Sequence, residues 1–450
     1  MTSQTYTYAD FCQSLGVTPE WLASEQGNLV LDDRTDRLPE DKLVVGGNLT
    51  IRQSRFTQWP VYVTVGGYLL VEQVDIPSLP QFLDVKGDAT FIDTGFASIH
   101  EGCHFHQSVT VCSSKFQHIH DHFHVHGDLI LAECSISTLP HGLVVDRILD
   151  IRHTSIRCIP EDCQCAELRA SGSKVDQLPD NWTVEVLDVS GCPLSHFPKG
   201  VRVIRDLVIS YTSIREIEQL LPDVNLIARY AALEKLPDGS RFGFLDLTGC
   251  SITQLPLRLI VTIGMDISET DIRCLPDESQ VMGYLIAHDS SLMTLPEQML
   301  LAGILIVTRT PIKTIPAGII CKAIVCEPEV QVDAYQFHID TEIEFHPNGK
   351  YVVVHHQMYE VVEHCEDVWK VTQLMTGEDR FVVTDGSGKF ADGVTPELAR
   401  AVLQGIDLED QQQPFLTSLQ TWNKEFRNAA ANQDRSGIQS GGAWTSWKKN

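Results

Sequence analysis

The sequence predicts a β-rich solenoid, in which short coils stack and their strands form one long parallel sheet. Three observations predict this fold. A Leu-Pro pair, or a close relative of it, returns every 19 to 21 residues over most of the 450-residue chain. Apolar and polar residues alternate inside each repeat, which is the period of a strand and not of a helix. Glycine pairs precede the alternating run, where a coil has to turn.

Fifteen apolar positions mark the repeat, and proline follows twelve of them. The marks are Leu38, Trp59, Leu79, Ile99, Ile119, Leu139, Ile159, Leu178, Phe197, Ile217, Leu236, Leu255, Leu275, Leu295 and Ile315. One coil of this length cannot bury its apolar face alone, whereas stacked coils bury a continuous core. We therefore expect a parallel-sheet array of about 15 coils over residues 37–335.

Each coil repeats one internal pattern of apolar residues. The pattern places them at offsets 0, 2, 5, 7 and 10, as in Leu245, Leu247, Cys250, Ile252 and Leu255. The first two positions alternate and are expected to point inward from a strand. A second, shorter alternating segment lies before this strand, as at residues 43–45. Between the two segments stand glycines such as Gly46-Gly47 and Gly66-Gly67, which we expect to adopt positive φ at a sharp corner.

The run LDLTGCSITQLP at residues 245–256 resembles the leucine-rich repeat pattern L-x-L-x-x-(N/C/T)-x-L-x-x-L-P. The resemblance extends over residues 38–330 and is strongest to the short, helix-poor repeats of bacterial and phage proteins. It implies the fold and says little about a partner, because such repeats bind many proteins. The offset-5 position holds Ser, Thr, Cys, Val or Ala and never Asn. Hydroxyl groups there can still bond the backbone, and Cys134, Cys192 and Cys250 are expected to be small buried residues.

The two ends of the array differ from the coils in pattern. Residues 1–36 show helical apolar spacing and predict a partly helical N-terminal cap. Residues 336–408 predict an α+β C-terminal cap, with strands in hairpins, a turn at Asn348-Gly349 and one helix starting at Thr395-Pro396. Residues 409–450 are rich in Gln, Ser, Gly and Asn and predict a mostly disordered tail.

Composition excludes several classes of function. The formal charge is −26, from 34 Lys and Arg against 60 Asp and Glu, so phosphate backbones and anionic membranes are repelled. No apolar run approaches the ~20 residues of a membrane span, and no secretory signal is visible. The 13 cysteines have no disulfide framework spacing, which favours a reducing, cytoplasmic location. We find no catalytic motif and expect a monomer that is not an enzyme and needs no cofactor.

The exposed face of the predicted sheet is the main candidate for function. The register aligns Asp150, Asp188, Asp246 and Asp266 in one outward row, with Arg152 beside it; aromatic residues enter the face at Tyr68, Phe244 and Tyr284. We expect this face to bind another protein, and the acidic row favours a basic one. The alternative is a secreted bacterial effector with activity in its C-terminal unit, because Cys365-Glu366-Asp367 has the C-x-D form of bacterial leucine-rich-repeat ubiquitin ligases.

Histidine is concentrated in one segment. Eight of the 17 histidines lie between residues 100 and 126. The register turns His104, His106, His124 and His126 outward and aligns them in adjacent coils, with Asp146 beside His126. Imidazoles at that spacing with a carboxylate nearby suit zinc or a similar divalent metal. A solvated polar face and a pH-sensitive contact surface are the alternatives.

Overall fold

The computed structural model describes residues 6–113, 115–276 and 278–336, followed by 343–345, 351–355, 357–365, 367–373, 377–385 and 389–404. The chain divides into two compact units, residues 1–339 and 340–450. The sequence predicted the boundary between the solenoid and the C-terminal cap at residue 335. The predicted tail at 409–450 and the predicted turn at Asn348-Gly349 lie outside the described residues.

Two short helices open the first unit. Helix α1 spans Tyr8–Ser14 and α2 spans Pro19–Leu22. Thr7 and Asp10 form a capping box at the start of α1, and Thr18 caps α2 with Pro19 in its first position. The Tyr8 hydroxyl donates a hydrogen bond to the Val44 carbonyl at 2.5 Å, which ties α1 to the first coil. Strand β1 (Leu29–Leu31) then enters the long sheet.

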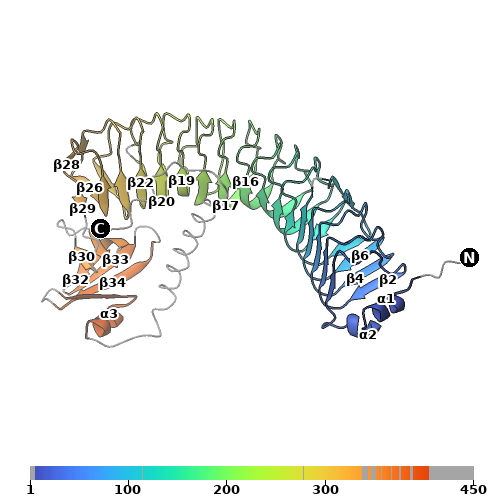
Figure 1. Ribbon diagram of the computed structural model, residues 1–450. Helices are drawn as coiled ribbons and strands as arrows, with labels where there is room; N and C mark the ends of the chain where they lie inside the picture. The colour runs from blue at the N-terminus through green and yellow to red at the C-terminus, as the bar shows by residue number, and fades with distance from the viewer. Residues whose placement is uncertain are drawn as a thin grey trace, which may run out of the picture. The chain divides into compact units, whose positions relative to one another are not determined.

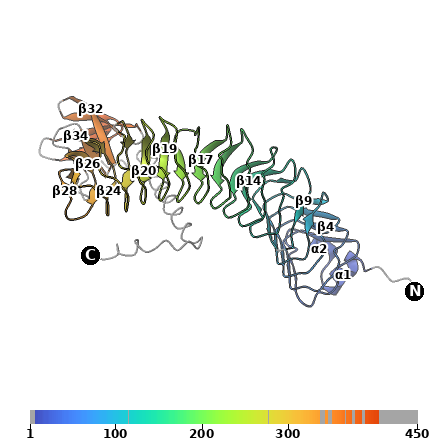
Figure 2. The same cartoon turned by 90° about the horizontal axis from the view of Figure 1, so that it is seen from above.

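One parallel ladder runs through the whole array. Its strands are β1, β3 (Leu49–Arg52), β5 (Leu69–Glu72), β7 (Ala89–Ile92), β10 (Val109–Cys112), β13 (Leu129–Ile130), β14 (Val144–Asp150), β15 (Gln164–Arg169), β16 (Thr183–Asp188), β17 (Arg202–Val208), β18 (Val224–Ile227), β19 (Arg241–Asp246), β20 (Ile260–Asp266), β22 (Tyr284–Ile286), β24 (Ile304–Ile306) and β27 (Ala323–Val325). In the described part of the chain, consecutive pairings follow sixteen rungs from Leu29 to Ile324. Within this unit the coils follow an arc, with β16 to β22 along its inner side (Figure 1). The coils stack one after another along the array (Figure 2). The predicted parallel-sheet solenoid of about 15 coils is confirmed.

The second segment of each coil forms its own sheet near the N-terminal end. Strands β2 (Lys42–Val45), β4 (Tyr62–Val65), β6 (Phe82–Val85) and β9 (Cys103–Phe105) pair in parallel. Strand β12 (His124–Val125) pairs instead with β14, whose single run spans both segments of its coil. The register shifts between Val145 and Ile148, so the two predicted segments remain distinct within the longer strands.

Short bridging strands complete the coils. They are β8 (Ser98–Ile99), β11 (His118–Ile119), β21 (Gln280–Val281), β23 (Gln298–Leu300), β25 (Thr314–Ile315), β26 (Gly318–Cys321), β28 (Gln331–Val332) and β29 (Tyr335–Gln336). They pair in parallel with the equivalent segment of another coil. The same neighbours are thus kept around the whole circumference of the coil.

The inward residues make one continuous core along the array. Twelve of the fifteen marks are buried, and the other three, Trp59, Leu178 and Phe197, pack against the core from its edge. Small polar groups at offset 5 bond the backbone, as predicted. The Thr154 hydroxyl donates to the Ile151 carbonyl of its own coil, and the Cys250 thiol donates to the Ala228 carbonyl of the preceding coil, both at 2.7 Å. Burial raises the pKa of Cys250 to about 12, which fits a structural thiol.

The expected reason for the corner glycines is wrong. Gly46, Gly47, Gly66 and Gly67 do not have positive φ. They are required because coils approach closely there: a Cβ on Gly66 would lie 2.0 Å from the Gly46 carbonyl oxygen. Positive φ occurs instead one to three residues after the end of a main strand, in Gln53, Gln73, Asp93, His153, Tyr211, Tyr230, Glu269, Asp289 and Arg309 among others. Each of these residues donates its backbone N–H to a carbonyl of the next coil or to an acceptor in it.

In its described residues, the second unit is an antiparallel meander with one helix. Its strands are β30 (Ile343–Phe345), β31 (Tyr351–Val354), β32 (Gln357–Cys365), β33 (Val368–Gln373), β34 (Asp379–Thr384) and β35 (Phe390–Gly393), paired in chain order. Helix α3 spans Pro396–Leu403, and the Thr395 side chain caps it by accepting the Leu398 N–H at 3.2 Å. A small core of its own includes Val352, Tyr359 and Val382.

Candidate functional site

The predicted acidic row exists, but it is not uniformly exposed. Asp150 and Asp188 stand in one column with Arg169 between them, and Asp246 and Asp266 are direct partners further along the same column. Asp150 is only 3% exposed and Asp246 is fully buried, so the expectation that all four carboxylates face solvent is wrong for these two. The physical reason is local. Each aspartate is short enough to turn back and accept the backbone N–H two residues later, at 2.9–3.1 Å.

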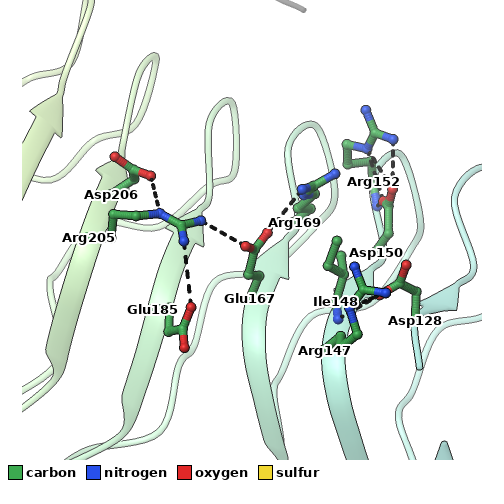
Figure 3. A network of polar contacts seen from close by, with 10 residues as sticks. All are labelled: Asp128, Arg147, Ile148, Asp150, Arg152, Glu167, Arg169, Glu185, Arg205 and Asp206. Carbon is green, nitrogen blue, oxygen red and sulfur yellow. Dashed lines mark hydrogen bonds and ion pairs between the residues drawn. The ribbon is translucent and has the colours of Figure 1, made fainter. Parts of the chain in front are cut away.

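The centre of the sheet face carries a network of ion pairs (Figure 3). Arg205 reaches Glu167 at 2.8 Å, Asp206 at 3.0 Å and Glu185 at 3.6 Å, so one guanidinium bridges three carboxylates. Arg169 adds a second cation to Glu167 at 3.0 Å. These charges are already paired within the protein, and a partner would have to displace them.

Asp150 and Arg152 belong to the same paired region. The Arg152 guanidinium donates to both oxygens of Asp150, at 3.0 Å from Nε and 2.7 Å from Nη2. One column over, Asp128 accepts the Ile148 N–H at 3.2 Å and pairs with Arg147 at 3.6 Å. The predicted binding residues Asp150 and Arg152 therefore stabilise the sheet, and their charges cancel.

The acidic pair further along the array is compensated incompletely. Arg229 Nε donates to Asp246 Oδ2 at 2.5 Å, and Thr248 donates its N–H and hydroxyl to Asp246 Oδ1 at 3.1 and 2.7 Å. Asp266 lies beside Asp246 and accepts the Ser268 N–H at 2.9 Å through Oδ1. Among the described residues, no Lys, Arg or His forms an ion pair with Asp266, although the Ser268 side chain and the Arg229 charge act on this carboxyl. Burial, and then the Asp246 charge, raise the pKa of Asp266, which means that both disfavour its charged form.

Aromatic rings border this acidic pair. Phe244 and Tyr284 stand on either side of Gly264 in the register, and their ring centroids are 6.1 Å apart. The Tyr284 ring covers Gly264, where an added Cβ would lie 2.4 Å from ring carbon Cε1. We call Arg229, Phe244, Asp246, Asp266 and Tyr284 the acidic–aromatic site.

The remaining predicted aromatic residue is not part of this site. Tyr68 is 45% exposed, as expected, but it belongs to the coil of Leu69, nine rungs before that of Leu245. At ~4.8 Å per rung, roughly 40 Å separate it from Phe244. Tyr68 thus stands in the same column as Phe244 and Tyr284 but in a distant part of the array.

The four predicted histidines fall into two groups with different neighbours. His124 Nε2 lies 2.8 Å from Asp146 Oδ1, and His126 Nδ1 lies 3.0 Å from Asp146 Oδ2. The two imidazole centroids are 4.1 Å apart. These hydrogen bonds lower the pKa of Asp146. The three donor atoms all lie within 4.8 Å of one another, and all three residues are exposed.

The other two predicted histidines have different surroundings. His106 Nε2 lies 2.8 Å from Asp84 Oδ1 and 2.9 Å from Lys86 Nζ. His104 pairs in register with Asp84 and lines a shallow groove together with His100, His118 and His120. In the described part of the chain, His124, His126 and Asp146 are the one group of three whose donor atoms converge for a metal ion.

Several contributing residues were not identified from the sequence. Arg229 was missed, although it stands at the same offset as Arg152. Asp84 and Lys86 were missed too, although they lie 20 residues before His104 and His106 and share their columns. The repeat register alone could have found all three.

The expectations about cysteines, membrane spans and the C-x-D resemblance remain to be compared with the structure. The twelve cysteines whose side chains the structure describes are all free thiols. Among the described residues, none of the helices has the length and hydropathy required to cross a bilayer. The side chain of Cys365 and all of Glu366 fall outside the described residues, so the C-x-D resemblance is not tested there.

Comparison with known proteins adds one structure. No protein-family pattern and no curated protein sequence matches the chain. Among solved structures, YopM from Yersinia enterocolitica WA-314 is similar over 72% of this chain and 84% of that one, at 16% sequence identity and a TM-score of 0.33. The solenoid assignment for this chain rests on its own strand register.

Proposed function

We propose that this chain is a non-enzymatic, protein-binding repeat module that recognises a basic partner through the acidic–aromatic site. A solenoid of leucine-rich-repeat-like coils is generally a scaffold for protein interaction. Its sheet face is rigid before binding, so little ordering entropy is lost when a partner docks. The observation that carries the proposal is the Asp266 carboxylate, which no cation among the described residues pairs directly and whose strand is the register neighbour of the Tyr284 strand.

Charge supports a cationic ligand group at this site. Two carboxylates share one guanidinium, because Arg229 pairs with Asp246 and the charge of Asp266 remains. A lysine or arginine side chain would neutralise Asp266 and lie against the neighbouring rings, where cation–π attraction contributes roughly 0.5–2 kcal/mol. The formal charge of −26 would speed the approach of a basic protein.

Apolar residues extend the surface beyond the acidic pair. Ile286 follows Asp266 in the same column, and Ile306 and Val325 follow it. Ile304 is 41% exposed and Val325 is 36% exposed. A matching partner segment would therefore place a cationic residue next to aliphatic residues.

Location and assembly belong to the same proposal. Free thiols and the absence of disulfide spacing support work in a reducing compartment such as the cytoplasm. We further propose that the chain acts as a monomer with one such site, that it needs no cofactor for this binding, and that nucleic acid and membranes are not its partners.

The proposal is tested with synthetic peptides and fluorescence anisotropy. The cationic probe carries one arginine flanked by isoleucines, and the acidic probe carries glutamate in its place. The full chain should bind the cationic probe more tightly. Asp266→Asn removes the charge but keeps an acceptor for the Ser268 N–H, so it should weaken binding about tenfold or more, equivalent to ~1.4 kcal/mol.

Asp188→Asn is the matched control. Asp188 stands in the same column and makes the same contact to the N–H two residues later, but Arg169 is its neighbour in register. This variant should retain affinity. Equal binding of the two probes, or an equal loss in both variants, would contradict the proposed site.

A further inference from the structure

The structure assigns a second, independent site: we propose that His124, His126 and Asp146 bind one borderline divalent metal ion of the zinc class. Two imidazole nitrogens and one carboxylate oxygen are a common ligand set for such ions. The donors come from neighbouring coils, since His124 is paired with Val144 and Asp146 is two residues further on. The site lies apart from the acidic–aromatic site and does not depend on it.

The geometry suits a tetrahedral ion. Bonds of ~2.0–2.1 Å place tetrahedral ligand atoms about 3.3 Å apart. The two carboxylate contacts are 2.8 and 3.0 Å long, and no pair of donors exceeds 4.8 Å. All three side chains are exposed, so they can close or open by about an ångström without moving the core. A fourth position would stay open to water or to a donor from another molecule.

The preceding coil has similar residues but cannot form an equivalent site. Lys86 Nζ lies 2.9 Å from His106 Nε2 and 3.0 Å from Asp84 Oδ2, so an ammonium group already occupies the place of the metal. A second cation there would be repelled. The Lys86 contact therefore disfavours His106 as a metal ligand, and among the described residues the donor atoms of His124, His126 and Asp146 are the ones that converge.

The inference is tested by isothermal titration of the reduced full chain with zinc chloride. The wild type should bind one zinc ion at this site, and calcium, which prefers six or more oxygen ligands, should give no comparable heat. The double variant His124→Ala/His126→Ala and the single variant Asp146→Asn should each lose most of the binding, at least about tenfold. Because the residues are exposed, circular dichroism should show unchanged folding.

The matched control is His104→Ala/His106→Ala, which removes two exposed or half-exposed histidines from the same strip. This variant should bind zinc like the wild type. No zinc-dependent heat in the wild type would overturn the proposal. Equal weakening in the two histidine double variants would also overturn it, because the ligands would then be the four histidines and not the triad.

Discussion

Gly66→Ala should destabilise the solenoid strongly, because two coils touch at this residue. The new methyl carbon would lie 2.0 Å from the Gly46 carbonyl oxygen and 2.8 Å from its carbonyl carbon. Both atoms belong to backbone, which cannot rotate away as a side chain can. The coils must therefore separate locally by about 1 Å or more to reach ordinary contact distance.

The cost can be worked out from what this separation breaks. Gly66 donates its N–H to the Val45 carbonyl, and Gly67 donates to the Gly47 carbonyl, both at 2.8 Å. Losing two backbone hydrogen bonds costs ~1–3 kcal/mol, and overpacking costs ~1–3 kcal/mol more. The loss in unfolding free energy should therefore be about 2–6 kcal/mol.

Urea unfolding followed by circular dichroism measures this loss, and hydrogen exchange locates it. Exchange should accelerate at residues 43–70 and less in distant coils, because each coil contacts only its neighbours. Gly239→Ala is the control: it has φ of +73° and no atom within 4 Å of the new carbon, so only backbone strain of ~1–2 kcal/mol is expected. If Gly66→Ala cost no more than Gly239→Ala, the close-approach explanation would be refuted.

Two further predictions concern the acidic pair. Asp246→Ala should lower the unfolding free energy by about 2–3 kcal/mol, because Arg229 and Thr248 lose their acceptor while the Asp266 charge stays near the half-exposed Arg229; a loss below 1 kcal/mol in urea unfolding would contradict the pairing. Asp266→Asn should instead stabilise the chain at pH 7, by up to ~1 kcal/mol. The pKa of Asp266 is raised in the folded state, so the wild type loses stability as pH rises through that pKa. Below the unfolded pKa of about 4, Asp266 is protonated in both states, and the stability advantage of Asp266→Asn should disappear. Thermal unfolding from pH 3 to 7 checks this, and an advantage that grew toward low pH would contradict it.

The periodic part of the fold could be predicted from the sequence. A 20-residue period fixes which residues share a column, because every coil has the same neighbours, and Leu149, Leu207, Leu245 and Leu305 indeed stand in one ladder. The same period placed Asp146 beside His126. These inferences need only the register and the inward or outward alternation of a strand.

Exposure and chemistry within a column could not be predicted in the same way. Alternation places Asp246 outward, but its short side chain returns to the backbone and Arg229 covers it. Likewise, the pattern makes His106 and His126 equivalent, whereas Lys86 reaches one and not the other. The length and the hydrogen-bond partners of each side chain decide its exposure and its surroundings. These properties do not repeat every 20 residues. The reason for the corner glycines could not be predicted either, because the close approach of two coils is not visible in the sequence of one repeat.

A charge swap at Asp266 tests most directly whether this carboxylate selects a basic partner. The dissociation constants of the cationic and acidic probes are measured by anisotropy for the wild type and for Asp266→Lys. We expect the wild type to prefer the cationic probe and the variant to reverse this preference. An unchanged preference in Asp266→Lys would show that the acidic–aromatic site does not read charge.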